Sequence, residues 1–516
     1  MGSASPEAIM RKPFYSRIVG ENDTALLLLF GAAVVLLHIL TNGKYGFHRD
    51  ELLTFTNARH LDWGYVIYPP VTAFLGRVEL VFFGTSLIGF RFFAAISQGI
   101  VLILTGLIAR ELGGQREAQL VAATAVTIGG SSLFAGSFMS YSTFDYTWWV
   151  AVAYLVARLL RSGDSHWWLA VGLVIGLGFL TKYSMAFLVA GVLGGLALTP
   201  ARRNFKSPWF WCGVTLTLLL ILPNLIWQCR HEFMSLACMQ AIHKRDIGWG
   251  WTDNFLLNQL WKCANPVTTP LWCAGLWYLF KTDAGKRYRT LGWMYVIPLL
   301  SLFAARGRDY YLAPAYPMLL AAGAVWGESF VGSLSDRASR IIRREIWWTM
   351  AIAGLFTAAL TLPIAPLGTT WWRMADAATG NFNMEIGWPE MAAQVAQIRS
   401  TLPANDQARL GILAGDEGET GAINLYGPPY GLPRAISGMN SNWLRGYGDP
   451  PPETVITLGL KRDLLEKTFA SCELAGRLTN PLGIENDATR GYEDIFVCRQ
   501  LRQSWPEFWK QFRYYG

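Results

Sequence analysis

Two adjacent carboxylates, Asp50 and Glu51, follow the first long apolar run of the chain and are preceded by the cations His48 and Arg49. A charged side chain that faces lipid costs about 2.5 kcal/mol or more, so such residues usually face a cavity or a partner. A carboxylate in that setting can accept a proton from a hydroxyl group. The same residues could instead form a solvated loop that starts a helix, with Asp50 near its N-cap and Glu51 favouring the helix dipole.

Cations and aromatic rings gather again in the segment RGRDYYLAPAYP, which contains Arg306, Arg308, Tyr310 and Tyr311. The planar guanidinium group of an arginine matches the oxygens of a phosphate group. A belt of Tyr and Arg at a membrane surface would have the same composition. The segment by itself therefore fits both a phosphate site and an interfacial belt.

Two further polar residues interrupt apolar segments. Asp145 lies between Phe144 and Tyr146, where it would either cap a helix or provide a second carboxylate that converges on the first pair. Lys182 separates two apolar runs, and it would either extend its amine toward the membrane surface or contact a substrate. The elements that surround these residues decide which of the side chains can meet.

The composition indicates a membrane protein. Of the 516 residues, 52% are hydrophobic and 16% are charged, and the mean hydropathy is +0.26. The formal net charge is +8, and the basic residues are dispersed between the apolar runs. This pattern is typical of basic cytoplasmic loops and does not indicate nucleic-acid binding.

The apolar runs predict a polytopic α-helical protein with about eleven transmembrane helices. Arg11, Lys12 and Arg17 precede the first run, so the positive-inside rule places the N-terminus in the cytoplasm and makes residues 42–87 the first exoplasmic loop. Within this loop, the apolar spacing from Glu51 to Leu61 predicts a short helix on the membrane surface. The runs with the clearest limits lie near 24–40, 88–112, 119–138, 167–180, 184–198, 209–227, 268–279 and 346–362.

The composition changes after the last run. We expect residues 1–365 to form the transmembrane domain. Residues 366–516 contain no run long enough to span a membrane, so we expect them to form a soluble exoplasmic α/β domain. Cys472 and Cys498 lie in this domain, where an oxidising compartment would let them form a disulfide. The expected elements are helices near 389–400 and 420–426 and strands near 410–414, 454–458 and 494–498.

Several segments together resemble a known family. The chain is similar to the bacterial family 39 glycosyltransferases, membrane enzymes with the GT-C fold that are related to protein O-mannosyltransferases and lipid A aminoarabinose transferases. The most specific part of the resemblance is the acidic pair followed by a Tyr-Pro-Pro turn in the first exoplasmic loop. The matching segments read HRDELLTFTNARHLDWGYVIYPPVTAFLGR, STFDYTWW, GFLTKYSMAF, PNLIWQ, HKRDIGW, RDYYLAPAYP and LPRAISGMNSNWL.

The resemblance implies a reaction and roles for several residues. It implies that a sugar is transferred, with inversion, from a polyprenyl-phosphate donor to an acceptor on the periplasmic side of a bacterial inner membrane. Asp50 matches the family's catalytic base or acceptor-orienting carboxylate, with Glu51 as its neighbour, while Arg308 and Tyr311 match the end that binds the donor phosphate. At the turn, Tyr68 stands where family members commonly have His or Lys. The further candidates for substrate binding are Arg49, Asp145, Lys182 and Tyr310.

Some points stay open at this stage. Some relatives use a divalent cation, Mg or Mn, and here its ligands would be Asp50 and Asp145. The acceptor could be a lipid, a glycan or a protein. A transporter or flippase of lipid-linked sugars would place charged residues near mid-span in paired halves. A non-catalytic membrane assembly protein would use the acidic loop only for structure.

Overall fold

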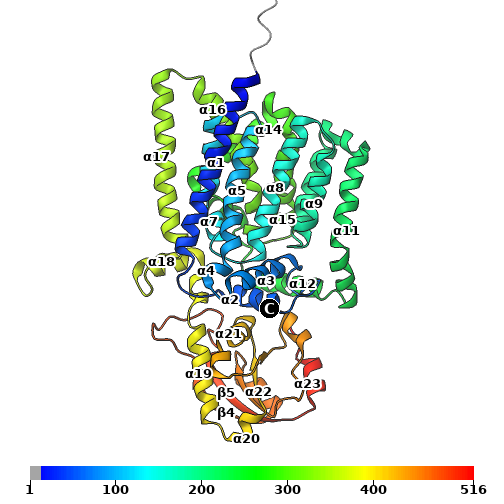
Figure 1. The fold of residues 1–516 in the computed structure, drawn as a ribbon, viewed down its shortest axis with the longest axis vertical. Helices are drawn as coiled ribbons and strands as arrows, with labels where there is room; N and C mark the ends of the chain where they lie inside the picture. The colour runs from blue at the N-terminus through cyan, green and yellow to red at the C-terminus, as the bar shows by residue number, and fades with distance from the viewer. Residues whose placement is uncertain (1–12) are drawn as a thin grey trace, which may run out of the picture.

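The computed structural model describes residues 13–516, with side chains described from residue 23 onward. The basic head that contains Arg11 and Lys12 lies outside the described residues, as does the side chain of Arg17. Figure 1 shows a body of long helices, a layer of short helices that cross its lower end, and a C-terminal domain below that layer. The N-terminal helix enters the body from the opposite end.

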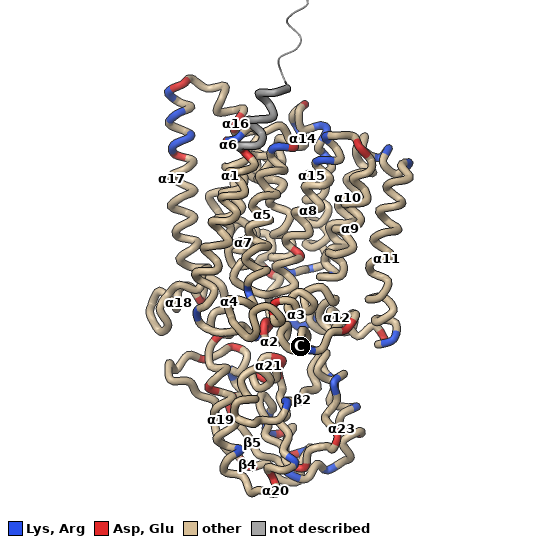
Figure 2. Tube along the Cα trace, in the orientation of Figure 1, with Lys and Arg blue, Asp and Glu red and all other residues tan. Residues whose placement is uncertain are grey.

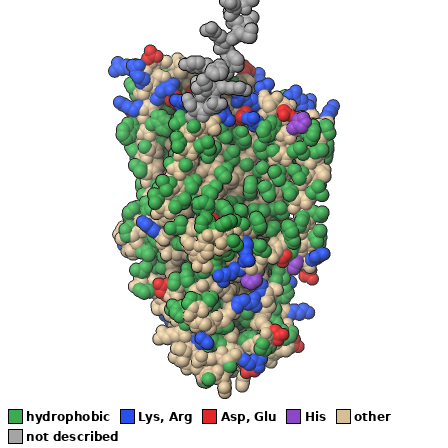
Figure 3. Space-filling view, viewed as in Figure 1, with side chains coloured by type: hydrophobic (Ala, Val, Ile, Leu, Met, Phe, Trp, Pro, Cys, Tyr) green, Lys and Arg blue, Asp and Glu red, His purple; other side chains and the backbone are tan. Residues whose placement is uncertain are grey.

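The helical body is built from apolar segments of very different length. Charged residues gather toward its two ends (Figure 2), and on the face shown in Figure 3 hydrophobic side chains cover the surface between them. This distribution is expected of a protein whose middle faces lipid. The helices of the body are α1 (Pro13–Thr41), α5 (Phe92–Glu111), α6 (Arg116–Thr127), α7 (Gly130–Ala135), α8 (Tyr141–Ser162), α9 (Trp167–Phe179), α10 (Met185–Ala197), α11 (Pro208–Arg230), α14 (Thr269–Lys281), α15 (Arg289–Ala304), α16 (Tyr316–Gly332) and α17 (Asp336–Thr361).

Only some of these helices could cross a membrane by length and composition alone. In the described part of the chain, three stretches qualify, namely Asp23–Thr41, Phe92–Glu111 and Pro208–Arg230. A fourth is added if the bent pair of α10 and the turn Pro200–Lys206 forms one span. The run expected near 119–138 is not one helix, because it divides into α6 and α7. The number of about eleven spans therefore stays a prediction from the alternation of basic loops.

Short helices close the lower end of the body (Figure 1). They are α2 (Arg49–Arg59), α3 (Val71–Phe83), α4 (Leu87–Phe90) and α12 (Met234–Gly248). The sequence predicts α2 as a helix on the membrane surface, yet its residues from Glu51 to Ala58 are buried. The reason is that α2 lies between the helical body and α21 of the C-terminal domain, so that both of its faces are covered.

The C-terminal domain contains a mixed five-stranded sheet in the order β2-β1-β3-β5-β4. β1 pairs in parallel with β2 and β3, whereas β5 pairs antiparallel with β3 and β4. The strands are β1 (Leu410–Ala414), β2 (Ala435–Ile436), β3 (Thr454–Leu458), β4 (Phe469–Arg477) and β5 (Asp494–Leu501), and the helices are α18 (Thr370–Thr379), α19 (Trp388–Thr401), α20 (Ala404–Ala408), α21 (Glu417–Tyr426), α22 (Arg462–Thr468) and α23 (Trp505–Gln511).

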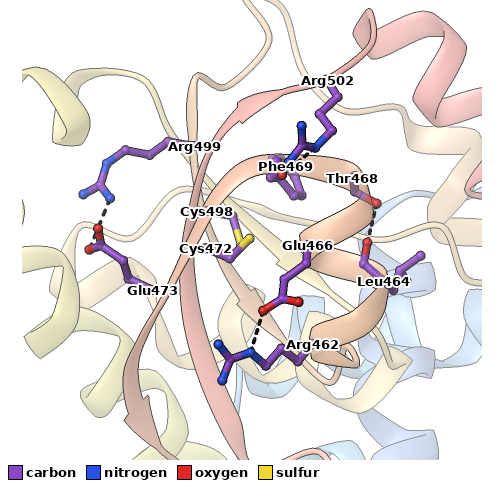
Figure 4. Close-up of a disulfide and its surroundings, with 10 residues drawn as sticks. All are labelled: Arg462, Leu464, Glu466, Thr468, Phe469, Cys472, Glu473, Cys498, Arg499 and Arg502. Carbon is purple, nitrogen blue, oxygen red and sulfur yellow. Dashed lines mark hydrogen bonds and ion pairs between the residues drawn. A yellow bond between two sulfur atoms is a disulfide. The ribbon is translucent and has the colours of Figure 1, made fainter.

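A disulfide joins the last two strands of this sheet. Cys472 of β4 and Cys498 of β5, the two cysteines that the sequence suggests as partners, lie opposite each other in the antiparallel register and are bonded. In Figure 4 the disulfide lies between the Arg499–Glu473 ion pair and the Arg462–Glu466 ion pair of α22. The bond ties the edge strand β4 to the middle of the sheet.

Candidate active site

Local capping fixes the start of α2, where the acidic pair lies. His48 is the N-cap, and its ring accepts a hydrogen bond from the backbone N–H of Asp50 at 3.1 Å. The Glu51 carboxylate in turn accepts from the backbone N–H of His48 at 2.9 Å. The interpretation of Asp50 as the N-cap of α2 is therefore wrong, because His48 has that role. The side chain of Asp50 stays free of the backbone and is 32% exposed.

The charges around Asp50 favour its ionised form. Arg49 Nε lies 3.2 Å from Asp50 Oδ1, and Arg49 Nη1 lies 3.6 Å from Asp416 Oδ2 of the C-terminal domain. Burial by itself would raise the pKa of Asp50, but Arg49 and the more distant Arg308 lower it below the ordinary value. Asp50 is therefore an ionised carboxylate at neutral pH, which is the form that can accept a proton.

Glu51 has a different environment from its neighbour. It is fully buried and forms a two-pronged ion pair with Arg91, with Nε to Oε1 at 2.8 Å and Nη2 to Oε2 at 2.6 Å. Its Oε1 also accepts from the backbone N–H of Met139 at 2.9 Å. The prediction that Glu51 takes part in the chemistry does not fit these contacts, because its oxygens are already used to hold α2 in place.

Arg308 is fixed on the opposite side of the site by an aspartate from α12. Its guanidinium group binds Asp246 with Nη2 to Oδ1 at 2.7 Å and Nε to Oδ2 at 2.5 Å. Burial would lower the pKa of Arg308, but Asp246 and the neighbouring tyrosines Tyr310 and Tyr311 raise it. Arg308 is thus a fixed positive charge, and its electrostatic interaction reaches Asp50.

Lys182 lies in a cage of tyrosine rings. Its Nζ is 4.2 Å from the ring centroid of Tyr311, 4.9 Å from that of Tyr310 and 5.4 Å from that of Tyr141. It also donates to the hydroxyl of Ser142 at 3.1 Å. Because only 8% of the residue is exposed, the amine does not extend to the membrane surface, and it is a second positive charge inside the site.

Tyr68 and Asp145 contact residues of the site, namely Tyr141 and Lys182. Tyr68 is fully buried, its hydroxyl accepts from Asn57 Nδ2 at 2.8 Å, and its ring stacks on Tyr141 with 5.2 Å between centroids. Asp145 lies within α8, which begins at Tyr141 after the N-cap Ser140, so the interpretation as a helix cap is wrong. Its Oδ2 instead accepts from Ser184 Oγ at 2.8 Å, and it interacts electrostatically with Lys182.

The structure brings most of the predicted residues to one place. Tyr141 lies at the centre of this group. It interacts electrostatically with Asp50, Arg308 and both tyrosines. The neighbouring predicted residues are Arg49, Asp50, Lys182, Arg308, Tyr310 and Tyr311. Tyr141 was not among the predicted site residues, and Asp246 stood out in the sequence only as a possible metal ligand together with His243. The signal for Tyr141 was its place at the head of the helix that carries Asp145, and the signal for Asp246 was an acidic residue in the otherwise basic stretch HKRD.

A metal site is not formed by the residues considered for it. Asp50 pairs with Arg49, and Asp145 pairs with Ser184 near Lys182. Within residues 23–516, no group of three or more His, Cys, Asp or Glu side chains is arranged to hold a metal ion.

Comparisons with known proteins agree with this geometry. Residues 68–227 match the family described as dolichyl-phosphate-mannose-protein mannosyltransferase. The chain is also 27% identical over 298 residues to the lipid A galacturonosyltransferase RgtD of Rhizobium johnstonii, a match that covers 56% of this chain and 61% of RgtD. The resemblance to these membrane glycosyltransferases is confirmed. The match spans less than two thirds of the length of RgtD.

Solved structures of low sequence identity share the fold. ArnT from Cupriavidus metallidurans bound to undecaprenyl phosphate superposes with a TM-score of 0.55 at 14% identity, covering 91% of this chain and 97% of ArnT. The apo oligosaccharyltransferase of Archaeoglobus fulgidus gives a TM-score of 0.50 at 13% identity, covering 86% of this chain and 70% of that one. The fold is therefore that of the GT-C membrane glycosyltransferases, with a C-terminal mixed-sheet domain.

Proposed function

We propose that the protein transfers a sugar from a polyprenyl-phosphate donor to a hydroxyl group of an acceptor. The observation that carries the proposal is the convergence of an ionised carboxylate, Asp50, with two fixed cations, Arg308 and Lys182. Transfer from a lipid phosphate needs a base for the acceptor and positive charge for the phosphate that leaves. The site supplies both on one side of the helical body.

The reaction is a single displacement. Asp50 takes the proton from the acceptor hydroxyl while the oxygen attacks the anomeric carbon of the donor sugar. The bond between that carbon and the phosphate oxygen breaks on the opposite face, so the configuration inverts. Arg308 and Lys182 stabilise the negative charge that develops on the polyprenyl phosphate as it leaves. Asp246 fixes the position of Arg308, and the ring of Tyr311 contacts Lys182, so both cations are in place before substrate binds.

Similarity supports a choice of substrates. The similar structure of ArnT holds undecaprenyl phosphate, and the relative RgtD is named for lipid A. We therefore propose an undecaprenyl-phosphate-linked donor and a lipid A-type acceptor, with the site on the periplasmic side of a bacterial inner membrane and the N-terminus in the cytoplasm. The division of the chain into a membrane domain of residues 1–365 and a periplasmic domain of residues 366–516 belongs to the same proposal.

Reconstitution tests the proposal directly. The purified protein in liposomes is given lipid A together with a panel of undecaprenyl-phosphate sugars, including galacturonic acid and aminoarabinose, and the products are analysed by mass spectrometry. We expect one modified lipid A species and free undecaprenyl phosphate in equal amounts. Movement of the sugar lipid across the bilayer without transfer would show a flippase, and neither transfer nor movement would show a non-catalytic protein.

A further inference from the structure

The C-terminal domain reaches the proposed site through the start of α21. Two glycines let this helix press against α2: a Cβ atom added at Gly418 would come 2.7 Å from Arg49 Cγ, and one at Gly421 would come 2.6 Å from Leu52 Cβ. The N-terminal turns of α2 and α21 therefore meet at Arg49, which pairs with Asp50 on one side and with Asp416 on the other.

Three carboxyl groups lie at the start of α21, and two of them have structural partners. Asp416 accepts from the backbone N–H of Gly418 at 2.7 Å and pairs with Arg49. Glu419 accepts from the backbone N–H groups of Gly415 and Asp416 at 3.1 and 3.0 Å. These two groups complete the capping of the helix.

Glu417 is the third carboxyl group, and it has no such use. It is only 3% exposed, and its Oε1 has no hydrogen-bond partner among the described residues. Arg49, Asn440 and Asp50 are among the neighbours that influence its pKa. A buried polar group without a partner is costly, so such a group in a native protein calls for an explanation.

The neighbour of Glu417 is also held in an unusual way. Asn440 is fully buried and has a backbone φ of 50°, a conformation that non-glycine residues rarely adopt. Its backbone N–H donates to Tyr514 O at 3.1 Å, and its side-chain amide donates to Gly516 O at 3.4 Å. The end of the chain thus fixes the position of Asn440.

We propose that Glu417 is a substrate-positioning residue that hydrogen-bonds a sugar hydroxyl next to Asp50, an inference that rests on the proposed transfer function. Burial and the neighbouring Asp416 raise the pKa of Glu417 to about 8, so the group is mostly a neutral acid at pH 7. A neutral carboxyl group donates one hydrogen bond and accepts another, which matches a sugar hydroxyl. Asp50 is held ionised and Glu417 neutral, so the two carboxyl groups can serve different roles in one site.

The test compares Glu417→Ala with Glu417→Gln in the reconstituted assay, using the donor that the wild-type protein accepts from the panel. Glu417→Ala should raise KM for the sugar substrate about tenfold, since it removes one hydrogen-bonding group. Glu417→Gln should stay within about threefold of the wild type, because an amide also donates and accepts. Binding of bare undecaprenyl phosphate, which carries no sugar, should be unchanged in both variants.

A neighbouring variant provides the control for structural damage. Glu419→Gln alters a buried carboxyl group of the same helix, which also has an oxygen without a hydrogen-bond partner but whose Oε2 caps two backbone N–H groups, so it should lower the thermal stability without changing the ratio between sugar-lipid and bare-lipid affinity. If Glu417→Ala leaves KM unchanged, or if it weakens bare undecaprenyl phosphate as much as the sugar lipid, the inference is wrong. If the wild-type protein transfers no sugar at all, the failure belongs to the proposed function instead.

Discussion

At the scale of single residues, Asp50 is the side chain on which the proposed chemistry depends. Asp50→Asn keeps the size and the helix start but removes the group that accepts the proton. Transfer should fall by about 10²- to 10⁴-fold, which is the usual contribution of a general base. Single-turnover transfer in liposomes measures this loss, and binding of undecaprenyl phosphate should persist.

The matched control for that variant is Asp62→Asn. Asp62 also lies in the first loop, where its Oδ1 accepts from the backbone N–H of Trp63 and its Oδ2 accepts from Trp227 Nε1, and an amide oxygen can keep one of these two bonds. Its transfer rate should stay within about twofold of the wild type. Equal losses in both variants would point to damage to the loop and would contradict the role of Asp50 as base.

Arg49 sets the pH dependence of the same carboxylate. The pKa of Asp50 is lowered, so Asp50 is ionised above that pKa, and activity should be lost only as the pH falls through it. Arg49→Gln removes the largest of the influences that lower this pKa. The acidic limb of kcat against pH should then move to higher pH. An acidic limb that does not move would show that another group controls it.

Arg308 should act through the geometry of its guanidinium group. Arg308→Lys keeps one positive charge but cannot keep both contacts to Asp246 and a fork toward phosphate. Affinity for undecaprenyl phosphate, measured by thermal-shift titration, should fall about tenfold. Arg306→Lys is the control, because Arg306 is exposed and pairs with the exposed Asp253. Equal effects of the two variants would contradict a phosphate site at Arg308.

At the scale of elements, a buried ion network joins α2, the start of α5 and the C-terminal domain. Arg91 pairs with Glu51 and lies 3.2 Å from Glu385, and its side chain is fully buried. Burial raises the pKa of Glu385 to about 8, so the carboxyl group of Glu385 is mostly neutral at pH 7. Arg91→Ala leaves Glu51 buried without its partner and should destabilise the protein by roughly 3 to 5 kcal/mol.

Thermal unfolding in detergent micelles measures this loss, with Arg462→Ala as the control. Arg462 and Glu466 form an exposed pair on α22, and such surface pairs contribute little to stability. The control should unfold at the wild-type temperature. If Arg91→Ala also unfolds there, the network does not hold α2 against the C-terminal domain.

The sequence predicted the elements where a periodic or continuous pattern exists. The strands at 410–414 and 454–458 lie at the expected positions, because both are fully buried and contain mostly apolar and β-branched residues. β4 was missed, since it is an edge strand whose residues are mostly exposed and show no alternation. β2 has two residues, too few for any pattern. α3 was not expected, because the whole segment 42–87 was interpreted as a loop with one short helix near its start.

The site could be predicted only as separate residues. Asp50, Arg308 and Lys182 stood out because charged residues beside apolar runs are costly. Their partners Tyr141, Asp246 and Asp416 were not recognised, because their roles depend on contacts between helices distant in the chain. The different roles of Asp50 and Glu51 depend on Arg91, which no spacing in the sequence connects to them.

At the scale of the whole molecule, the orientation in the membrane decides which compartment contains the site. The site lies at the end of the helical body that faces the C-terminal domain, and the described start of the chain lies at the other end (Figure 1). The alternation of basic loops predicts that the C-terminal domain is periplasmic. A fusion of alkaline phosphatase after Gly516 should therefore be active, because that enzyme folds only where disulfides form.

A second fusion, in the loop between α16 and α17 next to Ser335, reports the opposite side of the membrane. This loop is followed by Arg337, Arg340, Arg343 and Arg344. Arg343 pairs with Glu117 at the start of α6. By the positive-inside rule the fusion should be inactive, and a cysteine placed there should react only with a membrane-permeant reagent. An active fusion at Ser335 together with an inactive one at Gly516 would place the site in the cytoplasm. A lipid-linked donor presented in the periplasm could then not reach it.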